Sequence, residues 1–464
     1  MGAARRGLTP AEVVAAVGAA LADLPAGDPI VLALSGGPDS AALAVAVRLA
    51  RPDLAARAAH VRHGLRDDAA DVAAVTAQTA ALGLELTVLK VDVAATGEGP
   101  AAAARAARYA ALVSTARPDA AVLLLGHTAD DQAETVLLNV GRGTGTAGMG
   151  GMRAVTTRDG VTLRRPLLGV RRRCARSLAA DLPTVDDPSN VDPDRRRWRV
   201  RAHVLPTLAG LSGGPGDPVG LLCRLADLAR ADADALDALA TREVERLVIA
   251  WGPARVVGVA DLGALPPALA TRLVRGLLAA VRGGVAGLPS AAVEAALALP
   301  SGGQVDVAGG VRVSRGQGWL AAAPVGGVGL PARSVGPRGA AVPELGLALR
   351  VGEHPAAARV PPGAARSSAG RNATAVSAPE PPVGATLRGW APGDRVEARG
   401  RSRAVAALLA AAGVPRAVRP LVPVLTDARG RCIWVPGVVA VPAAGSGASQ
   451  VWLADAAPSA WPVR

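Results

Sequence analysis

A run of apolar residues that stops at a glycine pair and restarts as a helix constrains this chain more than any other feature. Residues 31–34 are apolar, and residues 36–37 are both glycine. Pro38 suits the first turn of a helix. A strand-to-helix turn of this kind offers unpaired backbone N–H groups and the positive end of a helix dipole to an anion. The stretch lacks the longer loop and the lysine of a Walker A motif. It therefore predicts a phosphate-binding loop in which another partner offsets the phosphate charge.

The residues around this loop alternate between strand-like and helix-like patterns. Short apolar runs predict strands near 30–34, 58–61, 84–91 and 121–125. Helical spacing predicts helices over 10–25, 38–49, 67–82, 101–116 and 130–140. Alternation of this kind implies an α/β fold, Rossmann-like, with a parallel sheet, helices on both faces and a ligand at the carboxyl ends of the strands.

Two polar segments follow the second and fourth expected strands. The first, residues 60–66, carries two histidines without an acidic or cysteine partner at ligand spacing, so a metal site is not favoured there. The second, residues 126–135, opens a helix in which Thr128 and Asp131 have the spacing of a capping box. Asp131 and Glu134 also share one helix face at the mouth of the sheet, which favours a functional role.

The length and the cysteines limit the class of protein. At 464 residues the chain fits two or three domains, and with 50% hydrophobic residues it can fold. No stretch looks like a membrane span, and Glu12 and Asp23 interrupt the apolar face that a signal peptide would need. Cys174, Cys223 and Cys432 lie too far apart in the sequence for a Cys-x-x-Cys site or a disulfide framework. We therefore expect a cytoplasmic protein with no membrane association.

The chain is strongly basic, with a net charge of +13 and a pI near 11.2. Such a charge favours a polyanionic partner such as nucleic acid. The chain has one lysine, Lys90, no Phe and one Tyr, which is the bias that a GC-rich genome imposes. Clustered arginines therefore carry more weight than their total.

Six segments together resemble one enzyme family. The loop Ser-Gly-Gly-Pro-Asp-Ser at 35–40 is similar to the signature of the PP-loop ATP pyrophosphatases, which cleave ATP to AMP and pyrophosphate and adenylylate a substrate oxygen. With five further segments, its order and spacing over residues 30–208 resemble the bacterial tRNA(Ile)-lysidine synthetase family. These five segments are residues 60–66, 104–109, 126–135, 165–168 and 187–190.

The resemblance implies an enzyme, a carbon–nitrogen ligase that uses ATP and Mg²⁺. It would attach free L-lysine to C2 of the wobble cytidine in the CAU anticodon of tRNA(Ile). An adenylylated cytidine would be the intermediate, and AMP and pyrophosphate would be released. The partners implied are therefore tRNA(Ile) and free lysine, and the sequence leaves a monomer and a homodimer open.

The resemblance also implies a set of site residues, carried over from the matching motifs. The catalytic acids implied are Asp39, Asp130, Asp131 and Glu134. The ATP-binding residues implied are Ser35, Gly36, Gly37, Pro38, Asp39, Ser40, Gly126 and His127. Mg²⁺ is assigned to Asp39 and Asp130, and tRNA or phosphate contacts are assigned to Arg105, Arg108, Arg197 and Arg201. Which acid contacts lysine and which contacts Mg²⁺ is open at this point.

One segment departs from the family pattern. After residues 187–190 the family has an aromatic residue and then an Arg-Asn pair, whereas this chain has Arg195 in place of the aromatic residue and Trp198 in place of the asparagine. Arg197 and Arg201 match the two arginines of the pattern, and such a pair can bind phosphate. The alternative interpretation is that this arginine run is only a solvated face.

The pattern of the chain divides it into four regions. Residues 1–208 form the expected PP-loop catalytic domain, and a mainly helical tRNA-binding domain is expected over 209–323. Residues 324–384 are rich in Gly and Pro and are expected to be a linker or an irregular region. Residues 385–464 resemble the C-terminal domain of the same family, which implies a small α/β domain that recognises tRNA. Helical spacing also predicts a buried stripe formed by Leu221, Leu222, Leu225 and Leu228.

Two other functions compete with ligation. A tRNA thiolase of the same superfamily would need catalytic or cluster-binding cysteines, which the cysteine count argues against. A non-catalytic tRNA-binding protein on the same scaffold would be expected to have lost Asp39 or the acids of residues 130–134, and both are present.

Overall fold

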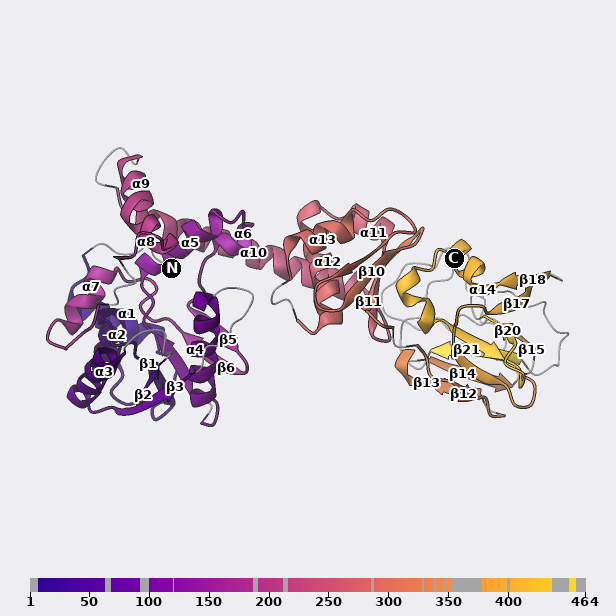
Figure 1. The fold of residues 1–464 in the computed structure, drawn as a ribbon, viewed down its shortest axis with the longest axis horizontal. Helices are drawn as coiled ribbons and strands as arrows, with labels where there is room; N and C mark the ends of the chain where they lie inside the picture. Colours follow the sequence, from indigo (N-terminus) through magenta and orange to yellow (C-terminus); the bar gives the residue numbers. More distant parts are fainter. Residues whose placement is uncertain are drawn as a thin grey trace. The chain divides into compact units, whose positions relative to one another are not determined.

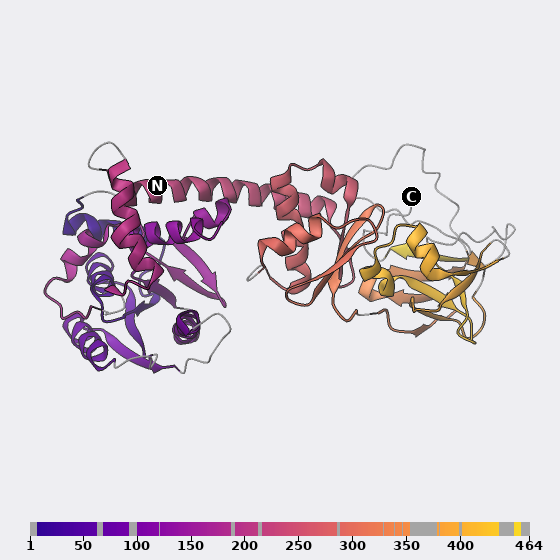
Figure 2. The same cartoon turned by 45° about the horizontal axis from the view of Figure 1, so that its top comes forward.

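The structure, a computed structural model, divides into two compact units, residues 1–234 and 235–464 (Figure 1). The residues described are 7–62, 68–91, 100–119, 121–186, 191–211, 216–284, 288–327, 329–337, 339–345, 347–352, 378–379, 381–398, 401–435 and 450–455. The division between the units falls inside helix α10 (Pro218–Leu247), which Figure 2 shows as one continuous helix. Within the described residues, no helix is both long enough and apolar enough to cross a membrane.

The first unit is built on a six-stranded sheet with the order β3-β2-β1-β4-β6-β5. Its strands are β1 (Pro29–Ala33), β2 (Ala55–Arg62), β3 (Glu85–Lys90), β4 (Val122–Leu125), β5 (Val155–Arg158) and β6 (Val161–Arg164). Strand β1 lies between β2 and β4 and is parallel to both. The expected α/β fold with a parallel sheet is confirmed.

An antiparallel hairpin that the sequence did not predict extends this sheet at one edge. Strands β5 and β6 pair through a two-residue turn at Asp159 and Gly160. Both residues have positive φ values, 49° and 83°, and turns of this kind match the twist of the flanking strands. The hairpin is short, which is why alternation over four residues was too weak a signal.

The side chains of β1 alternate between two hydrophobic cores, one on each face of the sheet. The helices of the first unit are α1 (Pro10–Ala20), α2 (Pro38–Ala50), α3 (Ala69–Leu82), α4 (Pro100–Ala116), α5 (Ala129–Val140), α6 (Thr146–Met149), α7 (Arg172–Arg176), α8 (Arg196–Arg199) and α9 (Leu205–Leu211). Ile30 and Leu32 pack in the core that includes residues of α1, α2 and α7. Val31 packs in the other core, with Leu112 of α4. Both faces of β1 are therefore covered, as in other parallel sheets.

The leucine stripe of α10 that was expected to be buried is mostly exposed. Leu222 is 9% exposed and packs in a small core with residues of α5, whereas the exposed fractions are 46% for Leu221, 42% for Leu225 and 63% for Leu228. The buried face of α10 carries small side chains such as Cys223 and Ala226, and α5 presents Ala133 to the same core. Small side chains allow two helices to approach closely, so the spacing of the large leucines indicated the wrong face.

In the second unit, residues 249–324 form a sheet as well as helices. The sheet has the order β7-β8-β11-β10-β9, with strands β7 (Ile249–Trp251), β8 (Ala254–Gly258), β9 (Gln304–Val307), β10 (Val311–Arg315) and β11 (Trp319–Pro324). Three helices accompany it, α11 (Val259–Ala264), α12 (Pro267–Arg282) and α13 (Ser290–Leu297). Leu273 and Leu277 of α12 pack with Val257 and Val313 of the sheet. This differs from the mainly helical region expected, because strands of three to six residues give little periodicity.

The rest of the second unit is also built from short strands. One four-stranded sheet consists of β12 (Arg333–Ser334), β16 (Thr386–Gly389), β19 (Pro423–Thr426) and β20 (Cys432–Trp434). Another consists of β13 (Gly339–Val342), β14 (Leu347–Gly352), β21 (Gln450–Asp455) and β15 (Ala378–Pro379). A hairpin of β17 (Arg395–Ala398) and β18 (Arg401–Ala404) precedes α14 (Val405–Ala411). Several of these strands lie within 324–384, where a linker or irregular region was expected, while residues 353–377 of that region lie outside the described part.

Replacing Leu43 by Ala tests the core beneath the glycine loop. Leu43 of α2 is fully buried, so we expect Leu43→Ala to lower the free energy of unfolding by about 2–5 kcal/mol, because the change leaves a cavity. Leu49→Ala on the same helix is the matched control: Leu49 is 61% exposed, and its loss should cost under about 0.5 kcal/mol. Hydrogen exchange of α2 peptides across a urea series measures both. Equal losses would contradict the burial of Leu43.

Candidate active site

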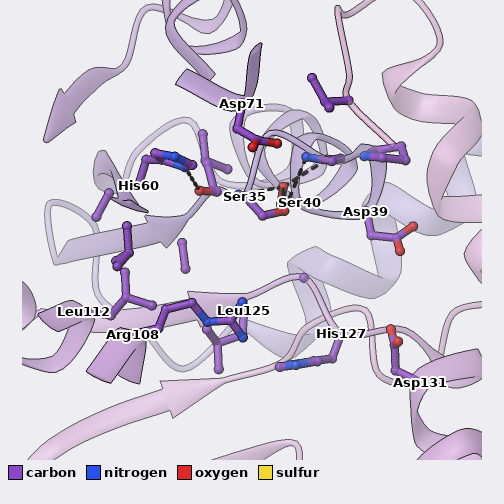
Figure 3. Close-up of a pocket in the computed structure, with 18 of the residues that line it drawn as sticks. Ser35, Asp39, Ser40, His60, Asp71, Arg108, Leu112, Leu125, His127 and Asp131 are labelled. Carbon is purple, nitrogen blue, oxygen red and sulfur yellow. Dashed lines mark hydrogen bonds between the residues drawn. The ribbon is translucent and has the colours of Figure 1, made fainter. Parts of the chain in front are cut away.

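A pocket of about 320 Å³ lies at the carboxyl ends of β1, β2 and β4 (Figure 3). This is where parallel sheets of α/β proteins bind ligands. Its walls come from the loop after β1, the end of β2, helix α4 and the start of α5. Of the residues that the sequence assigned to ATP, all but Gly36 line it, namely Ser35, Gly37, Pro38, Asp39, Ser40, Gly126 and His127.

Hydrogen bonds from distant residues hold the glycine loop in its shape. Gly36 has a φ of +86°, and a Cβ at this position would lie 3.1 Å from the carbonyl oxygen of Asp71, so glycine is required. The Gly36 carbonyl accepts hydrogen bonds from the Val185 backbone N–H (3.0 Å) and from Gln78 Nε2 (3.2 Å). Because protein donors hold this oxygen, it does not oppose an anion in the pocket.

The loop also packs tightly against its neighbours. The Ser40 hydroxyl accepts a hydrogen bond from the Ser35 backbone N–H (3.1 Å) and donates one to the Gly37 carbonyl (2.9 Å). A Cβ on Gly126 would lie 3.0 Å from the Asp39 carbonyl oxygen, so the segment after β4 needs glycine to approach the first turn of α2. The N-terminus of α2, with the positive end of its dipole, thus lies at the pocket, where it favours an anion.

Arg172 of α7 connects three of the acids assigned as catalytic. Its guanidinium lies 2.8 Å from Asp131 Oδ1, 3.3 Å from Asp39 Oδ2 and 3.4 Å from Glu134 Oε1. Burial alone would lower the pKa of this guanidinium, but the three carboxylates raise it above its ordinary value. Asp39 also contacts Arg176, at 2.7 Å. Helix α7 therefore ties the loop helix α2 to the acidic helix α5.

Asp131 serves both its helix and the pocket. Its Oδ2 accepts hydrogen bonds from the backbone N–H and the hydroxyl of Thr128, each at 2.9 Å, which is the capping-box arrangement that the spacing indicated. Its Oδ1 contacts Arg172, and the residue lines the pocket. Burial alone would raise the pKa of Asp131, but the charge of Arg172 and the hydrogen bonds from Thr128 hold it below its usual value. Asp131 is therefore ionised at neutral pH.

The other two acids assigned as catalytic, Asp130 and Glu134, do not line the pocket. The Asp130 carboxylate accepts hydrogen bonds from Arg171 at 3.1 and 3.2 Å and from the Arg172 backbone N–H at 2.7 Å. Glu134 is fully buried, and its Oε1 accepts a hydrogen bond from Arg201 Nε at 2.9 Å. Both acids thus hold α5 against arginines of later segments.

The arginines assigned to tRNA or phosphate divide in the same way. Arg201 pairs with Glu134, as described above, whereas the others line the pocket: Arg105, Arg108 and Arg197. The guanidinium of Arg105 lies 5.2 Å from the centre of the Tyr109 ring and that of Arg108 lies 5.8 Å from it, which are cation–π distances. Burial lowers the pKa of Arg108. The pocket therefore has a basic wall on α4, held in part by one aromatic ring.

His127 adds a neutral polar group to the pocket. Burial lowers its pKa to about 3, so the ring is uncharged at physiological pH. Within the described part of the chain, its Nδ1 has no hydrogen-bond partner. Figure 3 shows the ring at the same end of the pocket as Asp131.

Arg172 and Arg176, the cations that contact Asp39, were not among the residues assigned from the sequence. Both follow the Arg-Pro-Leu-Leu segment 165–168. Arg172 lies within the run Arg171–Arg173, and Arg176 lies three residues after it. That run was a usable signal, but one arginine cluster stands out little in a chain with 51 Lys and Arg residues. Two matched motif parts, residues 63–66 and 187–190, lie outside the described residues.

The pocket fits a Mg²⁺ ion that is bound together with a nucleotide. No group of three or more His, Cys, Asp or Glu side chains in the described ranges could hold a metal ion by itself. Mg²⁺ usually takes one or two carboxylates and completes its shell with substrate phosphates and water. Asp39, in the first turn after the anion-binding loop, supplies such a carboxylate. The donor set therefore fits the ion.

Comparisons with known proteins define the class of the first unit. The PP-loop domain profile matches residues 12–208, which include the sheet, the glycine loop and the pocket. The profile of the TilS substrate C-terminal domain matches residues 385–453. The fold and the loop are thus those of a PP-loop protein.

Three relatives of known name define the family. The tRNA(Ile)-lysidine synthase of Thermobifida fusca is 44% identical over 61% of this chain and 86% of its own length. That of Salinispora tropica is 40% identical over 67% of this chain and 96% of its own length. That of Mycobacterium tuberculosis is 42% identical over 55% of this chain and 76% of its own length. The chain belongs to the tRNA(Ile)-lysidine synthase family, which confirms the resemblance drawn from the motifs.

Replacing Arg172 tests its bridging role. We expect Arg172→Met to lower the free energy of unfolding of the first unit by roughly 3–5 kcal/mol, because buried carboxylates lose their counter-charge. Arg173→Met is the matched control, since Arg173 is exposed and its loss should change stability by under about 0.5 kcal/mol. Urea titration at fixed pH and salt compares the two. Similar losses for both variants would show that Arg172 does not bridge the acids.

Proposed function

We propose that this chain ligates free L-lysine to C2 of the wobble cytidine in CAU-anticodon tRNA(Ile), with ATP as the energy source. The observation that carries the proposal is the meeting of three features in one pocket: the anion-binding loop 35–40, the ionised Asp131 and the arginines of α4. The loop and the arginines suit a nucleoside triphosphate, and the carboxylate suits an amine beside it. Membership of the lysidine synthase family supports the same reaction.

The reaction needs two steps because the C2 oxygen of cytosine is a poor leaving group. In the first step this oxygen attacks the α-phosphorus of ATP, so that a new P–O bond forms and the bond to pyrophosphate breaks. In the second step the side-chain amine of lysine attacks C2. A C–N bond forms, AMP leaves with the C2 oxygen, and the amine loses a proton.

The loop and its neighbours are proposed to bind ATP. The N-terminus of α2 offers backbone N–H groups to the phosphates, and Arg105, Arg108 and Arg197 offset their charge from the opposite wall. Asp39 would hold Mg²⁺, which supplies the charge neutralisation that a Walker A lysine supplies elsewhere. Asp130 was also assigned to Mg²⁺, but it does not line the pocket, whereas Asp39 does, so the proposal keeps Asp39 alone.

Asp131 is proposed to hold the α-ammonium group of the substrate lysine, while the side-chain amine attacks C2. It is ionised and lines the pocket, and a carboxylate forms strong charge-assisted hydrogen bonds with an ammonium group. Glu134 is fully buried beneath Arg172 and Arg201, so it is proposed to position these two arginines rather than to contact lysine.

The tRNA is proposed to contact both units, and the reaction is proposed to take place in the cytoplasm. The C-terminal match covers residues 385–453, and Arg401 and Arg403 of β18 are exposed within it. Exposed arginines contact phosphates without reading sequence. These contacts would therefore orient the tRNA, while the pocket selects the base that reacts.

The cysteines do not favour thiolation. Cys174, Cys223 and Cys432 are all buried, and each packs in a different hydrophobic core. Burial raises the pKa of Cys223 and of Cys432 to about 12. Both therefore remain thiols at neutral pH, and a thiol is a much weaker nucleophile than a thiolate.

A direct assay tests the proposed function. The protein is incubated with ATP, Mg²⁺, labelled lysine and a tRNA(Ile) transcript that carries the CAU anticodon. We expect label in the RNA and an equal amount of AMP. A transcript with GAU in the anticodon is the control, because it lacks the wobble cytidine. The proposal fails if AMP forms without label in the RNA, or if both transcripts react equally.

Asp39→Asn tests the Mg²⁺ assignment. The change keeps the side-chain volume but removes the charge. We expect AMP formation to fall at least about 100-fold, because loop 35–40 has no second carboxylate that could bind the metal. Asp181→Asn is the matched control, since Asp181 is exposed and does not line the pocket. Rapid-quench measurement of AMP at saturating ATP compares them. A loss of threefold or less in folded Asp39→Asn would remove Asp39 from the metal site.

A further inference from the structure

One end of the pocket carries apolar side chains that the phosphate chemistry does not use. In Figure 3, His60, Leu112 and Leu125 lie at the end of the pocket away from Asp39 and Asp131. Leu112 is 3% exposed and Leu125 is 6% exposed, and the small side chains of Ala33 and Ala59 also line the pocket. Apolar walls of this kind suit the flat face of an aromatic base.

His60 is one of the polar side chains at this end, where Figure 3 also shows Arg108, and the hydrogen bonding of His60 fixes its tautomer. The ring is 4% exposed, and its Nδ1 lies 2.9 Å from the carbonyl oxygen of Leu34, a contact drawn as a dashed line in Figure 3. A carbonyl oxygen only accepts hydrogen bonds, so Nδ1 carries the proton. In the neutral ring Nε2 is then an acceptor, and among the residues that the structure describes it has no partner.

We propose that His60 Nε2 accepts a hydrogen bond from the 6-amino group of the adenine of ATP, and so selects adenine over guanine. The inference rests on the proposed function, because it requires that the pocket binds a nucleoside triphosphate. With the phosphates on loop 35–40, the base extends toward the end of the pocket where His60 lies. The buried acceptor there needs a donor, because an unsatisfied buried polar atom is costly.

The exocyclic group at position 6 of the purine decides the selection. Adenine carries an amino donor at this position, whereas guanine carries a carbonyl oxygen, which is an acceptor. Guanine would therefore face Nε2 with a second acceptor. The Leu34 carbonyl prevents the ring from adapting, because moving the proton to Nε2 would leave two acceptors opposed at Nδ1.

Nucleotide binding without tRNA tests the proposal separately from ligation. Calorimetry with wild-type protein and Mg²⁺ compares ATP with purine riboside 5′-triphosphate, which lacks only the 6-amino group. We expect the analogue to bind roughly tenfold more weakly, as for one lost hydrogen bond to a buried acceptor, and GTP to bind more weakly still. In His60→Ala the two affinities should agree within about twofold, and His60→Phe, which keeps a ring, should behave likewise.

Leu112→Ala is the matched control, because Leu112 lines the same end without a polar atom. This change should weaken the binding of ATP and of the analogue by the same factor, so that the ratio of their affinities stays at the wild-type value. A wild-type ratio near one, or an unchanged ratio in His60→Ala, would overturn the proposal. If His60→Ala instead removes the preference for ATP over 2′-deoxyATP, His60 binds the ribose and the adenine assignment is wrong. Failure of wild-type protein to bind ATP at all would refute the proposed function instead.

Discussion

The positive charge of Arg172 holds the candidate active site together. The carboxylates of Asp39, Asp131 and Glu134 come from two helices and all contact its guanidinium. Without a cation between them they would repel one another, and repulsion is strong where water is excluded. A buried guanidinium in turn needs such partners. The geometry of the pocket therefore depends on α7, a helix of five residues that lies well beyond the sheet strands β1 and β4 in the chain.

Much of the first unit could be predicted because its signals are local. A strand buried on both faces reads as an unbroken apolar run, and a phosphate loop needs glycines at fixed positions, so residues 31–40 reveal themselves in the sequence. The second unit gives weaker signals. Its strands are short and rich in alanine, as in β11 (Trp319–Pro324). At the end of the first unit, Leu221, Leu225 and Leu228 of α10 are exposed and lie outside the core that α10 shares with α5. Neither length nor periodicity separated such segments from helix or loop.

The site shows the same limit at the level of single residues. Loop 35–40, Asp131 and the arginines of α4 were found because each sits in a motif. The bonds that assign their roles join residues far apart in the chain: Arg172 is 41 positions from Asp131, and Arg201 is 67 positions from Glu134. No sequence spacing encodes such pairs. This is why Asp130 and Asp131, neighbours in one motif, could not be told apart before the structure placed one outside the pocket and one in its wall.

The shape of the glycine loop depends on residues that the ribosome adds long after it. The Gly36 carbonyl is held by Gln78 and by the backbone of Val185. At about 5–20 residues per second, Val185 is added roughly 7–30 s after Gly36. A growing chain that ends before Val185 contains the whole loop sequence without the contacts that shape it. The contacts that shape the loop are therefore complete only when nearly the whole PP-loop domain has emerged.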